Sequence, residues 1–437
     1  MRYLLNLVYL LLLAVAFPWL LYAAIRKGKY REGWSAKFWG RVPVRSGDRR
    51  CVWLHAVSVG EVNLLQPLLT AIERDYPDVE CVISTTTRSG FDVARQKYAP
   101  RQVFYCPLDF SWAVSAALRR IRPDVLVLAE LELWPNLMTA ARRRGVPVVV
   151  VNGRLSERSW RGYRRLASWA RRWLREIDLV GAQNPTYAER FRSLGVPAER
   201  VVITGSVKFD GVPSSRDNPA TRRLAELAGI QPQDVVFLAG STQHPEESLA
   251  LDAFQQLAPT FPQLRLILVP RHPERFSEVA ALLQKSGLAW RRRSELRPGE
   301  AAGEARVLLV DTVGELGAWW GLAQLAFVGG SMGTRGGQNM IEPAAYGAAV
   351  AFGPHTQNFR DVVSLLLAAD AATVVRTGRE LELWVRQGLE SESHRIEQGE
   401  RARQLVLAQQ GATQRTLDLL RPLLDSTPPA PTSKRAA

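Results

Sequence analysis

The chain has 437 residues, of which 46% are hydrophobic and 23% are charged, the balance of a globular protein of two or three domains. This composition excludes intrinsic disorder and collagen, and three cysteines are too few for a disulfide scaffold or a structural zinc site. The excess of Lys and Arg gives a net charge of +15, so we expect an anionic partner such as nucleic acid, a lipid headgroup or a phosphorylated substrate.

An apolar stretch at 3–25 is broken only by one Asn and one Pro. As a helix it spans about 34 Å, enough to cross the hydrocarbon core of a bilayer. The segment 26–50 carries nine Lys or Arg and two Asp or Glu, and such a basic segment stays on the cytoplasmic side. We therefore predict a membrane-anchor helix at 1–25. The alternative is a signal peptide cleaved near 14–16.

Short β-rich runs alternate with helical stretches after residue 50, a pattern that predicts parallel α/β sheets. The expected strands lie at 52–54, 80–85, 102–105, 125–128, 146–151, 179–182 and 201–204, and then at 235–239, 264–269, 307–310, 325–328 and 349–352. A charged, proline-containing segment at 209–233 separates the two groups, so we predict a linker there. The predicted domains are therefore 26–208 and 234–425, followed by a disordered tail at 426–437.

This alternation predicts two doubly wound, Rossmann-like domains that face a cleft, because ligands of open α/β sheets bind outside the carboxyl ends of the strands. A second basic cluster interrupts the first domain at 158–175, where seven arginines meet no acidic residue. Its apolar residues recur at helical spacing, so we predict one helix that either lies at a membrane surface or packs on the protein's own core. No recognition motif accompanies the charge, so we expect no nucleic-acid partner.

Three polar motifs follow predicted strands of the first domain. Glu61 begins a helix, where a carboxylate is either a reactive group or a helix-start residue that the helix dipole stabilises. Glu130 and Glu132 follow an apolar strand, and buried carboxylates are costly unless they are paired, which favours a functional site. Lys208 ends the domain beside Asp210, and the alternative to a functional role is a surface ion pair.

The second domain contains residues suited to phosphate recognition. Arg271 follows a predicted strand and has the chemistry for a bidentate contact with phosphate. The glycine-rich run 329–337 offers backbone N–H groups as a candidate phosphate cradle. Helix starts at 311–315 and 336–342 lie in the same domain, and Glu342 is placed to hold sugar hydroxyls. The chain lacks the NAD fingerprint, the Walker A loop, HExxH, paired CxxC and the serine elbow, which argues against NAD, ATP, metal-dependent and serine chemistry.

The motifs occur in an ordered series that resembles the Kdo transferases, the lipid A 3-deoxy-D-manno-octulosonic acid (Kdo) transferases of Gram-negative bacteria, up to about residue 420. The series comprises HAVSVGE at 55–61, ELELWPN at 130–136, NGRLSERS at 152–159, TGSVKFD at 204–210, PRHPERF at 270–276, DTVGEL at 311–316, FVGGS at 327–331, GGQNMIEP at 336–343 and FGPHTQNF at 352–359. The resemblance implies a GT-B glycosyltransferase that moves Kdo from CMP-Kdo to a lipid A precursor with inversion, without a metal in the active site and without a cofactor.

By motif, the resemblance implies that Glu61 is the catalytic base and that Glu130 and Lys208 assist the transition state. The implied CMP site comprises Pro270, Arg271, Val313, Gly314, Glu315, Asn339, Met340, Ile341 and Glu342. Gln338 and Gln243 stand where the family often has His. The implied location is the cytoplasmic face of the bacterial inner membrane, with an anionic membrane surface as a partner.

Two alternatives remain open from the sequence. One is another membrane-associated GT-B glycosyltransferase that uses a UDP-sugar. The other is a catalytically inert protein that binds a membrane surface, in which Glu61 would be only a helix-start residue.

Overall fold

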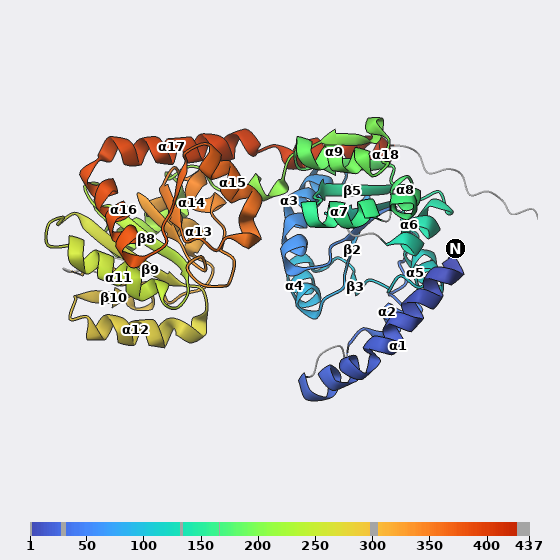
Figure 1. The fold of residues 1–437 in the computed structure, drawn as a ribbon, viewed down its shortest axis with the longest axis horizontal. Helices are drawn as coiled ribbons and strands as arrows, with labels where there is room; N and C mark the ends of the chain where they lie inside the picture. Colours follow the sequence, from blue (N-terminus) through green and yellow to red (C-terminus); the bar gives the residue numbers. More distant parts are fainter. Residues whose placement is uncertain (1, 28–31, 132–133, 166, 298–304, 426–437) are drawn as a thin grey trace, which may run out of the picture. The chain divides into compact units, whose positions relative to one another are not determined.

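The computed structural model describes residues 2–27, 32–131, 134–165, 167–297 and 305–425 (Figure 1). The chain divides into two compact units, Met1–Asp210 with Gln410–Ala437 and Gly211–Gln409. Each unit contains one parallel sheet of seven strands with helices around it. The predicted α/β fold with two parallel sheets is therefore confirmed.

The sheet of the first unit has the strand order β3-β2-β1-β4-β5-β6-β7. Its strands are β1 (Arg50–His55), β2 (Val79–Thr85), β3 (Val103–Tyr105), β4 (Val125–Ala129), β5 (Val148–Gly153), β6 (Leu179–Ala182) and β7 (Val201–Ile203). Its helices are α1 (Arg2–Lys27), α2 (Trp34–Trp39), α3 (Val59–Asp75), α4 (Arg88–Tyr98), α5 (Ser111–Ile121), α6 (Pro135–Arg142), α7 (Glu157–Arg165), α8 (Ala167–Leu174), α9 (Pro185–Ser193) and α18 (Ala412–Asp425), with short 3₁₀ turns η1 (Ala198–Arg200) and η2 (Val207–Phe209).

Both faces of this sheet are buried, which explains why its strands read as continuous apolar runs. Along β1, Cys51 and Trp53 belong to one buried cluster, whereas Val52 and Leu54 belong to another. Successive side chains of a strand point to opposite faces, so the two clusters lie on opposite faces of the sheet. The polar residues that follow each strand are left at the carboxyl edge.

Helix α1 packs on α5 through polar side chains. The Asn6 amide donates to Ser111 Oγ over 2.7 Å, and the Ser111 N–H donates back to Asn6 Oδ1 over 3.0 Å. The Tyr9 hydroxyl donates to Asp109 Oδ2 over 3.1 Å. The prediction of a membrane-spanning anchor at 1–25 is not supported, since within the described ranges no helix has both the length and the apolar content to cross a bilayer.

The basic cluster at 158–175 forms two helices, α7 and α8, on either side of residue 166. Trp160 and Tyr163 of α7, with Ala170 and Leu174 of α8, pack on the core of the first unit, while Trp169 is exposed. Of the two predicted roles for the apolar stripe, the structure therefore shows packing on the protein's own core.

The sheet of the second unit has the order β10-β11-β9-β8-β12-β13-β14. Its strands are β8 (Val235–Thr242), β9 (Leu264–Pro270), β10 (Trp290–Arg292), β11 (Val307–Leu309), β12 (Leu325–Val328), β13 (Ala349–Phe352) and β14 (Ala372–Val374). Its helices are α10 (Pro219–Ala228), α11 (Glu246–Leu257), α12 (Phe276–Lys285), α13 (Leu316–Trp319), α14 (Ile341–Ala345), α15 (Arg360–Ala368), α16 (Gly378–Glu390) and α17 (Glu392–Gln409), with 3₁₀ turns η3 (Pro273–Arg275), η4 (Arg293–Glu295), η5 (Trp320–Leu322) and η6 (Gln357–Phe359).

The unit boundaries differ from the predicted domains in two places. The predicted linker 209–233 contains helix α10 and belongs, from Gly211 onward, to the second unit. Helix α18, predicted within 234–425 of the second domain, belongs to the first unit and packs on α3. The reason is burial, because the leucines of α18 join the cluster that lies on one face of β1. The predicted tail 426–437 lies outside the described residues.

Candidate functional site

Glu61 lies in the first turn of α3, a helix of 17 residues that follows β1 after a short loop. The oxygen of the Ser58 hydroxyl accepts from the Glu61 N–H over 3.3 Å, and the same hydroxyl donates to Glu61 Oε1 over 3.1 Å. The Val57 N–H donates to Glu61 Oε2 over 2.7 Å. Ser58 is thus the N-cap of α3, and the Glu61 side chain reaches back to the N–H of Val57, one residue before the N–H that a capping box uses. The half-buried carboxylate is therefore held in one place at the start of α3.

The loop that carries Val57 is itself held by the end of β2. Three consecutive hydroxyls, those of Thr85, Thr86 and Thr87, donate to the Val57 carbonyl over 3.0, 3.2 and 3.2 Å. Thr87 also caps α4, because its Oγ1 accepts from the Gly90 N–H over 3.1 Å. The position of the Glu61 carboxylate thus depends on two neighbouring strands.

Glu130 follows β4 in the left-handed backbone region, with φ of 57°, which residues other than glycine rarely adopt. Its N–H donates to the Val151 carbonyl over 2.9 Å, which joins the end of β4 to β5. Unusual backbone conformations of this kind concentrate at functional sites. Glu132, the second acid of the motif, lies outside the described residues.

His55, to which the sequence assigned no role, connects the motifs of Glu61 and Glu130. It is the last residue of β1 and is buried, with Nδ1 2.8 Å from Ser84 Oγ. Its ring packs edge-on against Trp134, with ring centroids 5.4 Å apart. Burial lowers the pKa of His55 to about 4, so the imidazole is neutral at physiological pH. The available signal was a histidine at the end of an otherwise apolar strand.

Lys208 lies in η2, directly after β7, and is half-buried. The turn is fixed from β5, because the Val207 N–H donates to Asn152 Oδ1 over 3.2 Å. Helix α3, which carries Glu61, contacts η2. Asp210 does not serve as a surface ion pair for Lys208, because its two carboxylate oxygens accept from the N–H groups of Gly411 and Thr413 at the start of α18.

In the second unit, Pro270 ends β9 and Arg271 follows it. The Arg271 N–H donates to the Thr242 carbonyl over 3.0 Å, so the backbone is fixed while the side chain is exposed. Among the described residues, the Arg271 guanidinium has no hydrogen-bond or ion-pair partner. Its donors are therefore available to a ligand.

The segment 313–315 follows β11 and combines an open turn with an ion pair. Gly314 has φ of 91° and open space around it, and Val313 is exposed. Glu315 accepts two hydrogen bonds from Arg293, over 2.9 and 2.7 Å, and a third from the Thr312 hydroxyl over 2.7 Å. Burial acts to raise the pKa of Glu315, but Thr312 and Arg293 outweigh it and hold this pKa below its usual value.

The helix that follows Glu315 is short, so the predicted helix start at 311–315 offers a phosphate little stabilisation from a helix dipole. Helix α13 has four residues and passes into η5. A macrodipole sums over aligned peptide units, so four residues supply little of it. A phosphate at this turn would depend on individual N–H groups rather than on a long helix.

The segment 339–342 lies beside it. The Asn339 amide donates to Glu342 Oε1 over 2.9 Å, and Glu342 Oε2 lies 3.8 Å from the position that a Cβ atom on Gly317 would occupy. Burial raises the pKa of Glu342. The side chains of Met340 and Ile341 are buried, so only their backbone groups are available to a ligand. The predicted segments 313–315 and 339–342 are therefore brought to one region.

The glycine-rich run 329–337 does not offer the predicted phosphate cradle. The N–H groups of Gly330, Ser331 and Met332 donate to the carboxylate of Glu246 over 2.7, 2.8 and 2.9 Å. Glu246 is buried at the start of α11 and also accepts from the Gln243 N–H over 2.8 Å. A protein carboxylate thus occupies the place predicted for a phosphate. The tandem acids at 246–247 were the signal in the sequence.

The described part of the chain contains no group of three or more His, Cys, Asp or Glu side chains that could hold a metal ion. The candidate residues follow β1, β4 and β7 in the first sheet and β9, β11 and β12 in the second. Since each sheet is parallel, each set lies at one carboxyl edge, as expected for ligand sites of open α/β sheets.

Comparisons with known proteins bear on the family and the fold of the chain. The family profile described as 3-Deoxy-D-manno-octulosonic-acid transferase (kdotransferase) matches residues 32–211. The 3-deoxy-D-manno-octulosonic acid transferase of Bordetella pertussis is 37% identical over 419 residues, covering 92% of this chain and 94% of that protein. The enzyme of the same name from Haemophilus influenzae is 33% identical over 407 residues, with the same coverage. A crystal structure of UDP-GlcNAc 2-epimerase from Neisseria meningitidis shares the fold, with a TM-score of 0.56 and 12% identity over 85% of this chain and 100% of that one.

Proposed function

The chain belongs to the 3-deoxy-D-manno-octulosonic acid transferase family, and on that premise we propose that it transfers Kdo from CMP-Kdo to a lipid A precursor with inversion. The proposal places the protein in the synthesis of the lipopolysaccharide core. The observation that carries it is the fixed carboxylate of Glu61 at the carboxyl edge of the first sheet.

Glu61 acts as the general base in this proposal. A bond forms between an acceptor hydroxyl oxygen and the anomeric carbon of Kdo, the bond from that carbon to the CMP phosphate breaks, and the hydroxyl proton goes to Glu61. The Val57 N–H and the Ser58 hydroxyl fix the orientation of the Glu61 carboxylate, as the role of a general base requires. Glu130 and Lys208 assist at the same edge.

Arg271 and its neighbours bind the donor. The unpartnered guanidinium of Arg271 neutralises the departing CMP phosphate, which is the kind of electrostatic stabilisation that often contributes most to catalysis. Glu315 acts through its backbone because Arg293 and Thr312 occupy its carboxylate. Asn339 and Glu342 face the sugar hydroxyls of the nucleotide, and Met340 and Ile341 contribute backbone groups.

The lipid acceptor is supported by apolar surface next to the Glu130 motif. A cavity of about 470 Å³ is lined by Leu12, Leu13 and Ala16 of α1 together with Trp134. Exposed apolar side chains continue along α1, including Leu11 and Val15. We place the protein at the cytoplasmic face of the bacterial inner membrane, with α1 in contact with the lipid surface.

The experiment that tests this function is the mass of the product after incubation with CMP-Kdo and a tetra-acylated lipid A precursor. A mass increase by one or more Kdo residues is expected, together with inhibition by CMP. Turnover with UDP-sugars in place of CMP-Kdo would assign a different glycosyltransferase, and binding of the lipid without turnover of any sugar nucleotide would mean a non-catalytic protein.

A further inference from the structure

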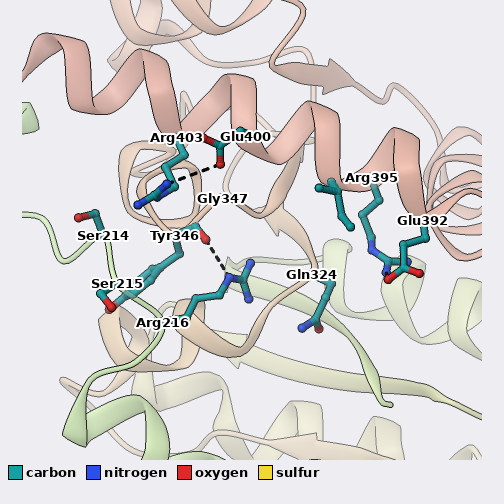
Figure 2. A pocket seen from close by; sticks show the side chains of 11 residues that line it. Ser214, Ser215, Arg216, Gln324, Tyr346, Gly347, Glu392, Arg395, Glu400 and Arg403 are labelled. Carbon is teal, nitrogen blue, oxygen red and sulfur yellow. Dashed lines mark hydrogen bonds and ion pairs between the residues drawn. The ribbon is translucent and has the colours of Figure 1, made fainter. Parts of the chain in front are cut away.

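A cavity of about 480 Å³ lies in the second unit, and none of the residues assigned to the donor lines it (Figure 2). Its lining includes Gln324, which directly precedes β12, and Gly347, which lies two residues before β13. The cavity is therefore at the amino edge of the second sheet, whereas Arg271 and the other donor-binding candidates follow carboxyl ends. The sheet is parallel, so the two places are at opposite edges.

Arg216 lines the cavity and has no carboxylate partner among the residues that the structure describes. Its guanidinium donates to three backbone carbonyls, those of Tyr346, Gly321 and Ala323, over 2.8, 3.1 and 2.7 Å. A guanidinium has five N–H donors, so two remain. Burial lowers the pKa of Arg216 to about 10, and the nearby positive charge of Arg395 acts in the same direction.

Helix α17 adds two more arginines to the lining of the cavity (Figure 2). Arg395 donates to the Gly388 carbonyl over 2.6 Å and to Glu392 Oε1 over 3.1 Å. Its side chain is 9% exposed, but that of Glu392 is 75% exposed, so solvent screens the acid that compensates it. Arg403 lies 3.6 Å from Glu400 at the rim. Three cations therefore face two partly solvated acids.

Neutral donors complete the lining. Gln324 Oε1 accepts from the Val236 N–H over 2.8 Å, which fixes the orientation of the amide and leaves its NH₂ group as a donor. The hydroxyls of Ser214 and Ser215 lie at the opposite side of the cavity in Figure 2. Arginine guanidinium groups with neutral hydrogen-bond donors around them are typical of sites that bind phosphate.

We propose that this cavity binds a small anion that carries a phosphate ester, at a site separate from that of the sugar nucleotide. The volume lies in the range of small-molecule sites, so it has room for a phosphate with an attached organic group. The phosphate can belong to a soluble ester or to the headgroup of a phospholipid. Because the site lies at the amino edge, its ligand does not compete with CMP.

The first test is calorimetric titration of the full-length protein with glycerol 3-phosphate, in the presence and absence of saturating CMP. Saturable binding with one site is expected, and CMP should leave the affinity unchanged. A second arm uses vesicles of phosphatidic acid against vesicles of phosphatidylcholine. Binding of glycerol 3-phosphate assigns the soluble source. Because α1 and the net positive charge also attract anionic vesicles, binding of phosphatidic acid vesicles assigns the lipid only when Arg403→Glu weakens it and Arg401→Glu does not. Absence of both, or displacement by CMP, overturns the proposal.

Matched variants on α17 make the test specific. Arg403 lines the cavity, whereas Arg401 binds Asp370 on another side of the helix, and their side chains are 39% and 35% exposed. Arg403→Glu should weaken binding about tenfold or more, and Arg401→Glu should change it less than about twofold. Equal weakening by both variants would show non-specific charge attraction and overturn the site.

Arg216→Gln tests the buried guanidinium directly. It should abolish binding, with its melting temperature measured on the same sample because three carbonyls lose their donor. Should this variant not fold, the Arg403 pair still decides. Arg271→Ala, in the proposed donor site, should retain full binding of glycerol 3-phosphate. Loss of binding there would move the anion to the donor site and overturn the proposal.

Discussion

Glu61 has two roles that a single substitution separates. Glu61→Gln keeps an oxygen to accept from the Val57 N–H but cannot take a full proton. Product formation should fall at least about 10²-fold, the contribution of a general base, while stability changes by no more than about 1 kcal/mol. Kinetics and thermal melting on one preparation check this.

Ser58→Ala is the control for the capping role of Glu61. It removes the N-cap hydroxyl of α3, which costs about 1 kcal/mol, and with it one donor to the Glu61 carboxylate, but the shorter hydrogen bond from the Val57 N–H remains. We expect a lower melting temperature and transfer close to normal. A Glu61→Gln protein that is active and only slightly destabilised would contradict the assignment of Glu61 as the base.

Arg271 carries the prediction for donor binding. Arg271→Ala should weaken CMP binding by about tenfold or more, since a hydrogen bond to a charged group contributes about 1.5 to 3 kcal/mol. Arg271→Lys should give an intermediate affinity, because lysine keeps the charge but not the planar fork. Stability should not change, since the Arg271 side chain has no partner among the residues that the structure describes. Unchanged CMP affinity in calorimetry would remove Arg271 from the site.

Asp109 predicts a pH dependence of stability. Burial raises its pKa to about 7, although the N–H groups of Asn136 and Leu137 and the Tyr9 hydroxyl oppose the shift. The pKa of Asp in an unfolded chain is about 3.9, so between about pH 4 and 7 the folded state binds one more proton at this residue than the unfolded state does. Stability from this group is present at the acidic end of that window and is lost as the pH rises through about 7.

The comparison with Asp109→Asn isolates this effect. The free energy of unfolding of the wild type, minus that of the variant, should decrease by at least about 1 kcal/mol between about pH 5 and 8. Asp252→Asn, at an exposed position on α11, is the control for the removal of a carboxylate. Denaturant unfolding at several pH values is the measurement. Parallel curves for wild type and Asp109→Asn would contradict the raised pKa.

At the scale of the element, we expect α1 to matter more for access to the lipid acceptor than for the stability of the fold. Deleting 2–25 removes the hydrogen bonds of Asn6 and Tyr9 but leaves both buried clusters of the first unit. We expect a moderately lower melting temperature, retained turnover of detergent-dispersed acceptor, and turnover of bilayer-embedded acceptor reduced roughly tenfold or more.

A matched variant separates lipid contact from folding in α1. Leu11→Ser with Val15→Ser removes two side chains that are 59% and 82% exposed and keeps the polar contacts of α1. It should reproduce the defect on bilayers with an unchanged melting temperature. Normal activity on bilayers would assign α1 to the fold alone.

Strands with an apolar run could be predicted from the sequence, and strands with polar residues could not. All seven strands of the first sheet were predicted, whereas β10 and β14 of the second were missed. Length and edge position do not explain this difference, because β3 and β7 also have three residues and lie at the edges of their sheet. The difference is composition: β10 reads Trp-Arg-Arg and β14 reads Ala-Thr-Val, so neither has the apolar run of a buried strand. The roles of Glu246 and His55 could not be predicted from the sequence either, because each depends on partners that are distant in the chain.

At the scale of the whole molecule, the first unit depends on α18. Leu417, Leu420 and Leu424 are buried in the cluster that also contains residues of α3. Each buried leucine contributes about 1.5 to 3 kcal/mol, so losing three is comparable with the whole stability of a domain. A chain ending at 409 should therefore lack the thermal transition of the first unit, as calorimetry would show.

Deleting only 426–437 is the control for this truncation, and it should leave the melting profile unchanged. The unit boundary was misplaced from the sequence because α18 follows α17 almost directly, after two residues, and nothing in its own pattern assigns it to either sheet. Only the burial of its leucines does. A normal transition in the chain that ends at 409 would show that α18 is dispensable for the first unit.

Because the chain returns to its first unit at the end, the two units are completed in a fixed order during protein synthesis. The second unit is continuous, so all of its strands are synthesised before α18. The first unit is translated first, but its apolar surface on α3 stays exposed on the nascent chain until α18 has been made and covers it. The half of the enzyme that holds Glu61 is therefore expected to mature last, and to be the half that needs chaperone protection during translation.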